Sequence, residues 1–95
     1  MNYNIDLSIV IISWKMKDLL RSCLESIYKF TEQVNFEIIV IDNNSQDGTS
    51  MMIRNEFLKV ILIVNGENRG VAPARNQGIA IAKGKYIVVL DADGA

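Results

Sequence analysis

Two aspartates, one residue apart, follow the last apolar run of the chain. The run is YIVVL, and Asp91 and Asp93 come directly after it in the 95-residue sequence. Histidine is absent, which excludes zinc fingers and Ser-His-Asp or Cys-His catalysis. Carboxylates suit a hard cation such as Mg²⁺ or Mn²⁺, which takes one or two of them together with substrate phosphates. Because many buried strands end in aspartate, this motif needs support from other residues.

Asp42 is a third candidate. It ends the apolar run FEIIVID and begins the stretch DNNSQDGT. Asn44 or Ser45 would cap a helix there, with Asp47 and Gly48 in its first turn. Capping does not explain Asp42, because a carboxylate at the end of a buried strand is costly unless a ligand or the protein supplies hydrogen-bond donors. Both sources of donors are open at this point.

Arg75 lies in the expected first turn of a helix, within ENRGVAPARNQG. The positive end of a helix dipole disfavours a cation there by about 0.3–1 kcal/mol. Departures from local rules gather at functional sites, and a helix N-terminus together with an arginine binds phosphate well. Arg75 is therefore a candidate phosphate ligand. The alternative is an exposed arginine paired with Glu67.

Four runs rich in Val and Ile must position these residues. Their hydrophobicity is continuous rather than alternating, which is typical of parallel strands buried on both faces. The four runs are LSIVIIS at 7–13, FEIIVID at 36–42, VILIVN at 60–65 and YIVVLD at 86–91.

Helical patterns fill the three segments between the strands. In the first, Cys23 shares an apolar face and would pack as a small hydrophobe rather than react. In the second, Met51 and Met52 would fill the core. The third spans about 71–83 and would end at Gly84 in a left-handed cap.

Alternating strands and helices predict a parallel α/β sheet with right-handed crossovers. Ligands of such sheets bind at the carboxyl ends of the strands, where the winding reverses. That edge would gather Ser13, Asp42, Asn65 and the aspartates at 91 and 93. Most of the polar chemistry is therefore expected on one edge of the sheet.

Composition narrows the class of protein. The length fits one domain covering residues 1–95, and 49% hydrophobic residues indicate an ordinary globular core. A formal net charge of −1 with scattered Lys and Arg gives no nucleic-acid footprint. The N-terminal stretch has no cationic leader, and its apolar run is too short to span a bilayer. We expect a cytoplasmic protein.

The order of the motifs is more specific than any one of them. A strand-end aspartate, an arginine opening the third helix and Asp-x-Asp after the fourth strand together resemble the N-terminal half of the family-2 inverting glycosyltransferases, from Leu7 to Asp93. The resemblance implies a GT-A fold, which is Rossmann-like: three α/β/α layers around a four-stranded, mostly parallel sheet of order 3-2-1-4. The stretches DLLRSCLES and IDNNSQDGT favour the rhamnosyltransferase-like branch, although two asparagines of its pattern are Ser13 and Lys15 here.

The resemblance also implies a role for each candidate residue. The donor would be a nucleoside-diphosphate sugar of the UDP, GDP or dTDP type, with Mg²⁺ or Mn²⁺ as cofactor. Ser13 would lie beside the base and Asp42 would contact it, while Arg75 would approach the base or the diphosphate. Asp91 would bind the ribose and share the metal with Asp93. Four residues of the intervening loop and helix would be structural: Asn68, Gly70, Asn76 and Gly78.

In that family the general base lies well after the Asp-x-Asp motif. We therefore expect this chain to be a nucleotide-binding part, cut after the motif and unable to transfer sugar alone. The full-length enzyme could associate peripherally with the cytoplasmic face of a membrane. The fourth strand, which later elements would normally cover, is expected to promote self-association through its open edge.

Three alternatives are weighed. A Rossmann dinucleotide-binding domain requires G-x-G-x-x-G after the first strand, where this chain reads SWKMKD without glycine. A receiver-type signalling domain would need an early acidic pair, a central aspartate, a late lysine and a fifth strand. The third alternative is a non-enzymatic α/β fragment whose carboxylates bind nothing.

Overall fold

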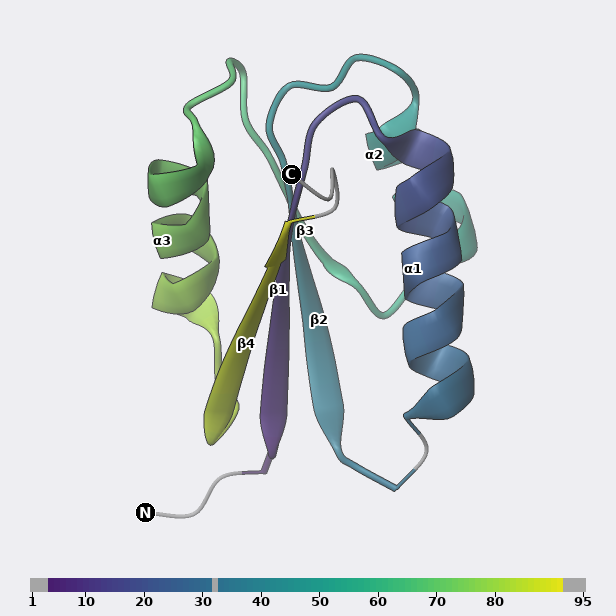
Figure 1. The fold of residues 1–95 in the computed structure, drawn as a ribbon, viewed down its shortest axis with the longest axis vertical. Helices are drawn as coiled ribbons and strands as arrows, with labels where there is room; N and C mark the ends of the chain where they lie inside the picture. The colour runs from purple at the N-terminus through teal and green to yellow at the C-terminus, as the bar shows by residue number, and fades with distance from the viewer. Residues whose placement is uncertain (1–3, 32, 92–95) are drawn as a thin grey trace.

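The computed structural model describes residues 4–31 and 33–91. In that part the sheet has the order β3-β2-β1-β4, and every neighbouring pair is parallel. Helices α1 and α2 cover one face and α3 covers the other (Figure 1). The predicted α/β/α layers and strand order are confirmed. The elements are β1 (Leu7–Ser13), α1 (Lys17–Phe30), β2 (Phe36–Asp42), α2 (Thr49–Glu56), β3 (Ile61–Val64), α3 (Val71–Ile81) and β4 (Tyr86–Asp91).

The central strands are buried on both faces because each lies between two helical layers. Side chains alternate along β1: Ile9 and Ile11 belong to the core beneath α1 and α2, whereas Val10 and Ile12 belong to the core beneath α3. Strand β2 alternates in the same way. A continuous Val and Ile run is therefore required on these strands, as the sequence indicates.

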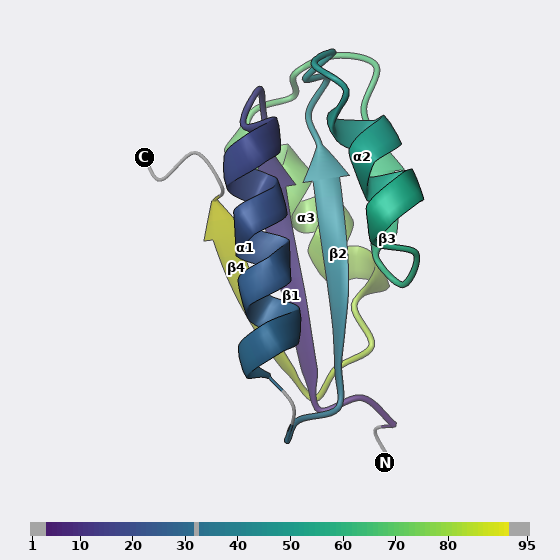
Figure 2. The ribbon, with the colours of Figure 1, turned by 90° about the vertical axis from the view of Figure 1, so that its right-hand side faces the viewer.

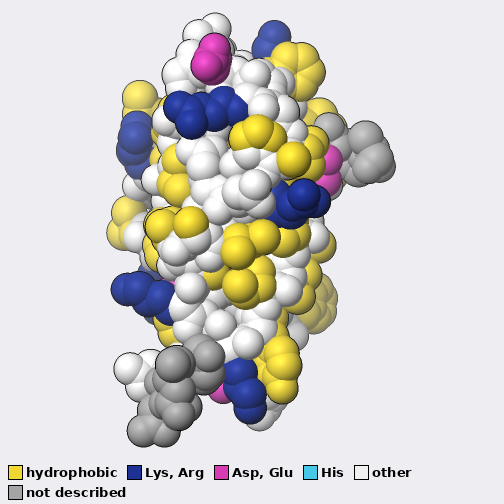
Figure 3. All heavy atoms as spheres, turned by 90° about the vertical axis from the view of Figure 1, so that its left-hand side faces the viewer, with side chains coloured by type: hydrophobic (Ala, Val, Ile, Leu, Met, Phe, Trp, Pro, Cys, Tyr) yellow, Lys and Arg dark blue, Asp and Glu magenta, His cyan; other side chains and the backbone are white. Residues whose placement is uncertain are grey.

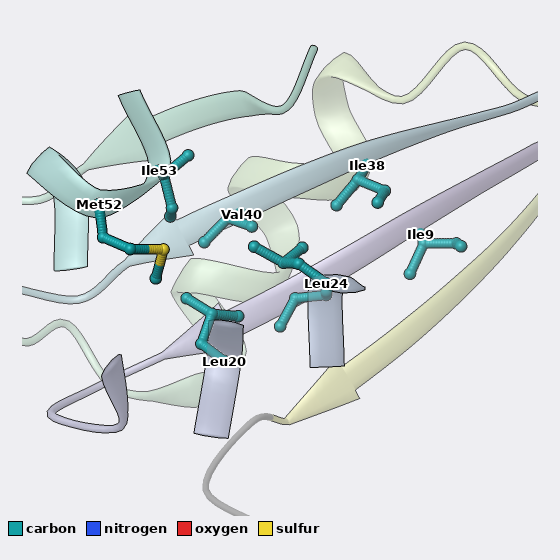
Figure 4. Close-up of a cluster of buried hydrophobic side chains, with 8 residues drawn as sticks. Ile9, Leu20, Leu24, Ile38, Val40, Met52 and Ile53 are labelled. Carbon is teal, nitrogen blue, oxygen red and sulfur yellow. The ribbon is translucent and has the colours of Figure 1, made fainter. Parts of the chain in front are cut away.

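The larger core lies between the sheet and the helices α1 and α2, which lie side by side in Figure 2. Figure 4 shows Leu20 and Leu24 of α1 reaching the sheet beside Val40, with Met52 and Ile53 of α2. The expectation that both adjacent methionines fill the core was half wrong, since Met51 is 62% exposed. The buried residues of this short helix are Thr49, Met52 and Ile53, so Met51 lies on its outer side.

Cys23 lies half-buried on α1 and packs against this core, as predicted. Burial raises the pKa of its thiol, because an ionised sulfur is poorly solvated there. The side chain therefore acts as a small hydrophobe and is a weak nucleophile at neutral pH.

Helix α3 packs closely on the other face, since a Cβ at Gly78 would lie 2.3 Å from Cγ1 of Val10. Only a residue without a side chain allows this contact, so Gly78 is structural, as expected. The outer side of α3 carries apolar residues, and Figure 3 shows hydrophobic side chains gathered across this face. Val71, Ile79 and Ile81 are each at least 40% exposed.

The predicted left-handed cap at Gly84 was wrong. Helix α3 ends at Ile81, Ala82 is extended, and Gly84 does not have a positive φ. A Cβ at Gly84 would instead lie 2.5 Å from the backbone nitrogen of Ser8, and its N–H donates to Ser8 Oγ at 2.7 Å. The glycine is needed for a close approach between the α3–β4 turn and β1.

The start of α2 also differs from the expectation. Neither Asn44 nor Ser45 caps it, because the helix begins at Thr49 after Gly48, whose φ is +88°. Asp47 supplies the acceptor: its Oδ1 receives hydrogen bonds from the N–H, at 3.1 Å, and the hydroxyl of Thr49. Ser45 Oγ instead accepts the backbone N–H of Lys15 at 2.8 Å and ties two loops together.

Candidate functional site

The carboxyl ends of the strands form one edge of the sheet, which we call the rim, and α3 begins beside it (Figure 1). Ser13 and Asp42 are register partners at the last positions of β1 and β2. Asn65 follows β3, and Asp91 ends β4 opposite Ile12. The structure therefore brings four of the strand-end residues predicted from the sequence, Ser13, Asp42, Asn65 and Asp91, to a single edge.

Asp42 is buried, with 3% of its surface exposed. Its Oδ1 accepts the backbone N–H of Ser45 at 3.0 Å. Within residues 4–31 and 33–91, no protein group donates to Oδ2. The protein thus satisfies one carboxylate oxygen and leaves the second able to accept a hydrogen bond from a ligand.

The neighbouring hydroxyl of Ser13 is fully buried, and among the described residues it has no hydrogen-bond partner. An unsatisfied buried hydroxyl costs about 1–3 kcal/mol. Such a group beside a half-satisfied carboxylate is expected where a polar ligand completes the hydrogen bonding. Ser13 and Asp42 can together accept one hydrogen bond and either donate or accept another.

The N-terminus of α3 is open to an anion. Its N-cap is Gly70, with φ +84°, so no side chain caps the first turn, and the turn contains no acidic residue. Arg75 follows on the same helix and is exposed. The alternative pairing of Arg75 with Glu67 is not observed, because the ion pairs in the described part of the chain involve Arg21 instead.

The candidates approach the rim from both sides of the sheet. By alternation, Ser13 and Asp42 share the side of α1 and α2. Asp91 pairs with Ile12 on the side of α3, the helix that carries Arg75. A ligand contacting all of them would therefore lie across the rim rather than on one face.

Asp93 lies outside the described residues, so the structure does not place the predicted metal pair. Asp91, the other member, is partly buried at the end of β4. Among the residues that are described, no group of three or more His, Cys, Asp or Glu could hold a metal ion. A cation here would depend on one or two carboxylates and on oxygens from its ligand, the mode that Mg²⁺ commonly uses.

The rim also carries an exposed aromatic residue. Trp14 is 43% exposed, and Lys15 Nζ lies 4.9 Å from its ring centroid. Lys15 has a left-handed backbone, with φ 54°. It lines a shallow cavity of about 440 Å³ that also borders Lys17 and Asp47. This cavity places two lysines beside the rim.

Sequence reasoning missed a network of amide side chains under the rim. Asn65 Nδ2 donates to Asn43 Oδ1 at 3.0 Å, and Asn65 and Gln77 exchange two hydrogen bonds of 2.8 Å. Asn43 also accepts the N–H of Arg69 and donates to the carbonyl of Gly70, both at 3.1 Å. The signal available in the sequence was the gathering of polar residues at strand ends; nothing local marked Gln77.

Solved structures that contain a bound nucleotide sugar share this fold. The mannosyltransferase PcManGT from Pyrobaculum calidifontis, in complex with GDP-Man and Mn²⁺, superimposes with a TM-score of 0.81 at 25% identity, over 98% of this chain and 31% of that one. S. aureus TarS 1–349 in complex with UDP-GlcNAc gives 0.76 at 25% identity, over 93% of this chain and 26% of that one. The fold is therefore the GT-A-like fold of nucleotide-sugar glycosyltransferases.

The family model described as "Glycosyl transferase family 2" matches residues 8–95, and the chain belongs to that family. A similar curated protein is the UDP-Glc:alpha-D-GlcNAc-diphosphoundecaprenol beta-1,3-glucosyltransferase WfaP of Escherichia coli. It is 39% identical over 87 residues, which cover 90% of this chain and 34% of that protein. The chain spans about a third, or less, of the length of the curated relatives it matches. The Rossmann dinucleotide-binding and receiver alternatives are thereby set aside.

None of the helices in residues 4–31 and 33–91 combines the length and the apolar character that crossing a bilayer requires.

Proposed function

We propose that this chain forms the donor-binding part of an inverting glycosyltransferase, which transfers a sugar from a nucleoside-diphosphate sugar to an acceptor hydroxyl. The observation that carries the proposal is the Ser13–Asp42 pair. A buried hydroxyl that has no partner among residues 4–31 and 33–91 adjoins a buried carboxylate with one oxygen that these residues leave available, at the rim where ligands of such sheets bind. The N–H groups of a nucleotide base would satisfy both.

The diphosphate would lie at the start of α3. The uncapped first turn offers backbone N–H groups and the positive end of the helix dipole, and no acidic residue opposes an anion there. Arg75 adds a guanidinium without an ion-pair partner in the described part of the chain. The sequence placed Arg75 in the first turn of the helix, but α3 begins at Val71, so Arg75 lies just past that turn.

A divalent cation fits the donor set. The chain offers carboxylates and no histidine, which favours Mg²⁺ or Mn²⁺ over softer metals. Asp91 and Asp93 would hold it, and Asp91 would also reach the ribose. When bound, the cation would neutralise the charge that develops on the diphosphate leaving group.

We further infer that the whole enzyme belongs to the rhamnosyltransferase-like branch, on the strength of DLLRSCLES and IDNNSQDGT. WfaP is named for UDP-Glc, and two similar structures for GDP-Man and UDP-GlcNAc. These names support a nucleoside-diphosphate sugar without choosing one. A titration with dTDP, UDP and GDP shows which of the three bases the chain binds most tightly, and that preference tests the assignment to this branch.

Binding of nucleoside diphosphates tests the proposal directly. Calorimetry or NMR titration of the 95-residue chain with UDP, GDP and dTDP should detect a complex that Mn²⁺ strengthens. Uridine without phosphate should bind more weakly, because the α3 N-terminus and Arg75 would then have no ligand. If none of the three diphosphates binds, with or without Mn²⁺, the proposal fails and a non-enzymatic α/β module is favoured.

The resemblance assigns no general base within residues 1–95, so we propose that this chain binds donor without transferring its sugar. The activity assay contains a UDP-sugar, Mn²⁺ and an acceptor hydroxyl. Product formed well above the uncatalysed background would contradict the assignment.

Self-association through β4 is also proposed. Its support is the position of β4 at an edge of the sheet, with apolar side chains more than a third exposed. Those side chains are Tyr86, Ile87, Val88 and Leu90. Sedimentation at rising concentration should show a dimer, and Val88→Lys should abolish it. A single monomeric species at every concentration would overturn this point.

A further inference from the structure

The amide network under the rim connects the two halves of the proposed site. Asn43 follows Asp42 directly in the chain, and Gln77 lies two residues beyond Arg75. Asn65, between them, bonds to both amides. Three elements that are far apart in sequence, the ends of β2 and β3 and the helix α3, are thus joined by neutral side chains.

Two of the three amides of the network are buried, and their hydrogen bonds fix how they are oriented. Asn43 and Asn65 are only 2% and 4% exposed. Asn65 and Gln77 bond reciprocally, each donating to the other's oxygen at 2.8 Å, so neither amide can turn over without losing both bonds. A backbone hydrogen bond also fixes the position of Asn65, since its N–H donates to the Asp42 carbonyl at 2.9 Å.

Asn43 connects the amide network to the backbone just before the first turn of α3. Its oxygen accepts the N–H of Arg69, and its nitrogen donates to the carbonyl of Gly70, the N-cap. Gly70 has φ +84° and no side chain of its own to fix the turn. The backbone entering α3 is therefore held from outside the helix, by the residue next to the candidate base-binding carboxylate.

We propose that Asn43, Asn65 and Gln77 are positioning residues, which hold the N-terminus of α3 and Arg75 at a set distance from Asp42, so that base and diphosphate are bound together. This inference rests on the proposed function and deepens it. The network contacts no ligand itself. Its contribution is preorganisation: without it, part of the binding free energy would be spent on ordering the 65–70 loop.

A merely structural network would predict a different result. Removing Gln77 leaves the Asn65 amide short of two bonds and lowers stability, whether or not the network positions a ligand. Positioning adds a selective effect, because it concerns the diphosphate half relative to the base half. The affinity ratio of UDP to uridine measures that relation, and a general loss of stability does not change it.

The test compares Gln77→Leu with the parent 95-residue chain in Mn²⁺, at a temperature where circular dichroism shows both folded. UDP affinity should fall about tenfold, equal to about 1.4 kcal/mol, while uridine affinity changes less than about twofold. Ile53→Val, a core truncation beneath α2 that costs about 0.5–1.5 kcal/mol, is the destabilised control and should leave the ratio unchanged. In an Arg75→Ala background, Gln77→Leu should have little further effect.

Asn43→Ala is the second variant. It releases Gly70 and Arg69 and removes the Asn65–Asn43 bond, but it leaves the two bonds between Asn65 and Gln77 in place. It carries the same expectation if Gln77→Leu does not fold. Equal losses for UDP and uridine, or no loss of either, overturn the positioning role while the proposed function stands. A parent chain that binds neither UDP nor another nucleoside diphosphate overturns both.

Discussion

Ser13 and Asp42 lie side by side as register partners at the ends of adjacent parallel strands. Both are buried, and the described residues leave each of them incompletely hydrogen-bonded. Folding alone would favour an apolar residue in place of this serine, because its hydroxyl costs free energy when it is buried without a partner. Asp42 at least receives the Ser45 N–H. The pair is understandable as a cost to stability that ligand binding offsets.

Ser13→Ala should therefore separate stability from binding. Without the unsatisfied hydroxyl, the free energy of unfolding should stay unchanged or rise by up to about 1 kcal/mol, as measured by urea denaturation. UDP affinity should fall about three- to tenfold, since the base loses one hydrogen bond worth about 0.5–1.5 kcal/mol. Ser26→Ala, at an exposed position of α1, is the control and should change neither. A destabilised Ser13→Ala protein with parental affinity would refute this account.

The metal assignment predicts a loss of metal dependence rather than a loss of the fold. In Asp93→Asn, UDP should bind about as tightly with Mn²⁺ as without it, because an amide is a weaker ligand than a carboxylate for a hard cation. Calorimetric titrations with and without Mn²⁺ give the ratio for the variant and for the parent. Asp6→Asn, an exposed aspartate at the opposite end of the sheet, should keep the parental ratio. If Asp93→Asn keeps it too, Asp93 is not a metal ligand.

The layers and strand order followed from local patterns, because a strand covered on both faces must be apolar throughout. The strands 7–13, 36–42 and 86–91 were predicted with their observed bounds. The third was predicted over 60–65 but is observed only at Ile61–Val64, since Val60 and Asn65 bond outside the strand ladder. Hydrophobicity indicates an apolar run, but it does not show which residues at the two ends of the run pair with the neighbouring strand.

The remaining errors concern contacts between distant segments. The role of Gly84 depends on Ser8, which is 76 residues away, and that of Gln77 depends on Asn65 and Asn43. No local propensity contains such a partner. At α2, Asn44 and Ser45 were good cap residues by type, but Asn44 has a left-handed backbone and Ser45 is bonded to Lys15. Tertiary contacts decided between equivalent local choices.

The close contact between Gly78 and Val10 predicts that any side chain at position 78 forces α3 away from the sheet. In Gly78→Ala the new Cβ would lie 2.3 Å from Val10 Cγ1, so helix and strand must separate, at a cost of about 1–3 kcal/mol. Val10→Ala removes the methyl groups that clash, and in that background the same change should be much less harmful. Gly66→Ala, whose Cβ meets nothing within 4 Å, is the matched control. Thermal unfolding of the parent, the two single variants at positions 78 and 10, and the double variant forms a double-mutant cycle. Purely additive costs in that cycle would contradict the contact.

Asp47 predicts the pH dependence of stability. Partial burial alone would raise the pKa of its carboxyl. The hydrogen bonds from the hydroxyl and N–H of Thr49 lower this pKa by a larger amount, so the folded pKa lies below the ordinary value of 3.8. A carboxylate with a depressed pKa stabilises the fold above the unfolded value, and that contribution is lost as the pH falls through the folded value. Asp47→Asn keeps an oxygen that can accept both hydrogen bonds but removes the charge, so it should be less stable than the parent at pH 7 by about 0.3–1 kcal/mol, the usual worth of a charge near a helix N-terminus. The difference should narrow below pH 3.8, where the parental carboxylate is progressively protonated. Urea unfolding of both proteins between pH 7 and pH 2.5 measures this difference in unfolding free energy.

Thr49→Val removes one of the two donors to Asp47 and should show part of the same loss. If the difference between the parent and Asp47→Asn stays constant down to pH 2.5, the Asp47 charge does not stabilise the start of α2.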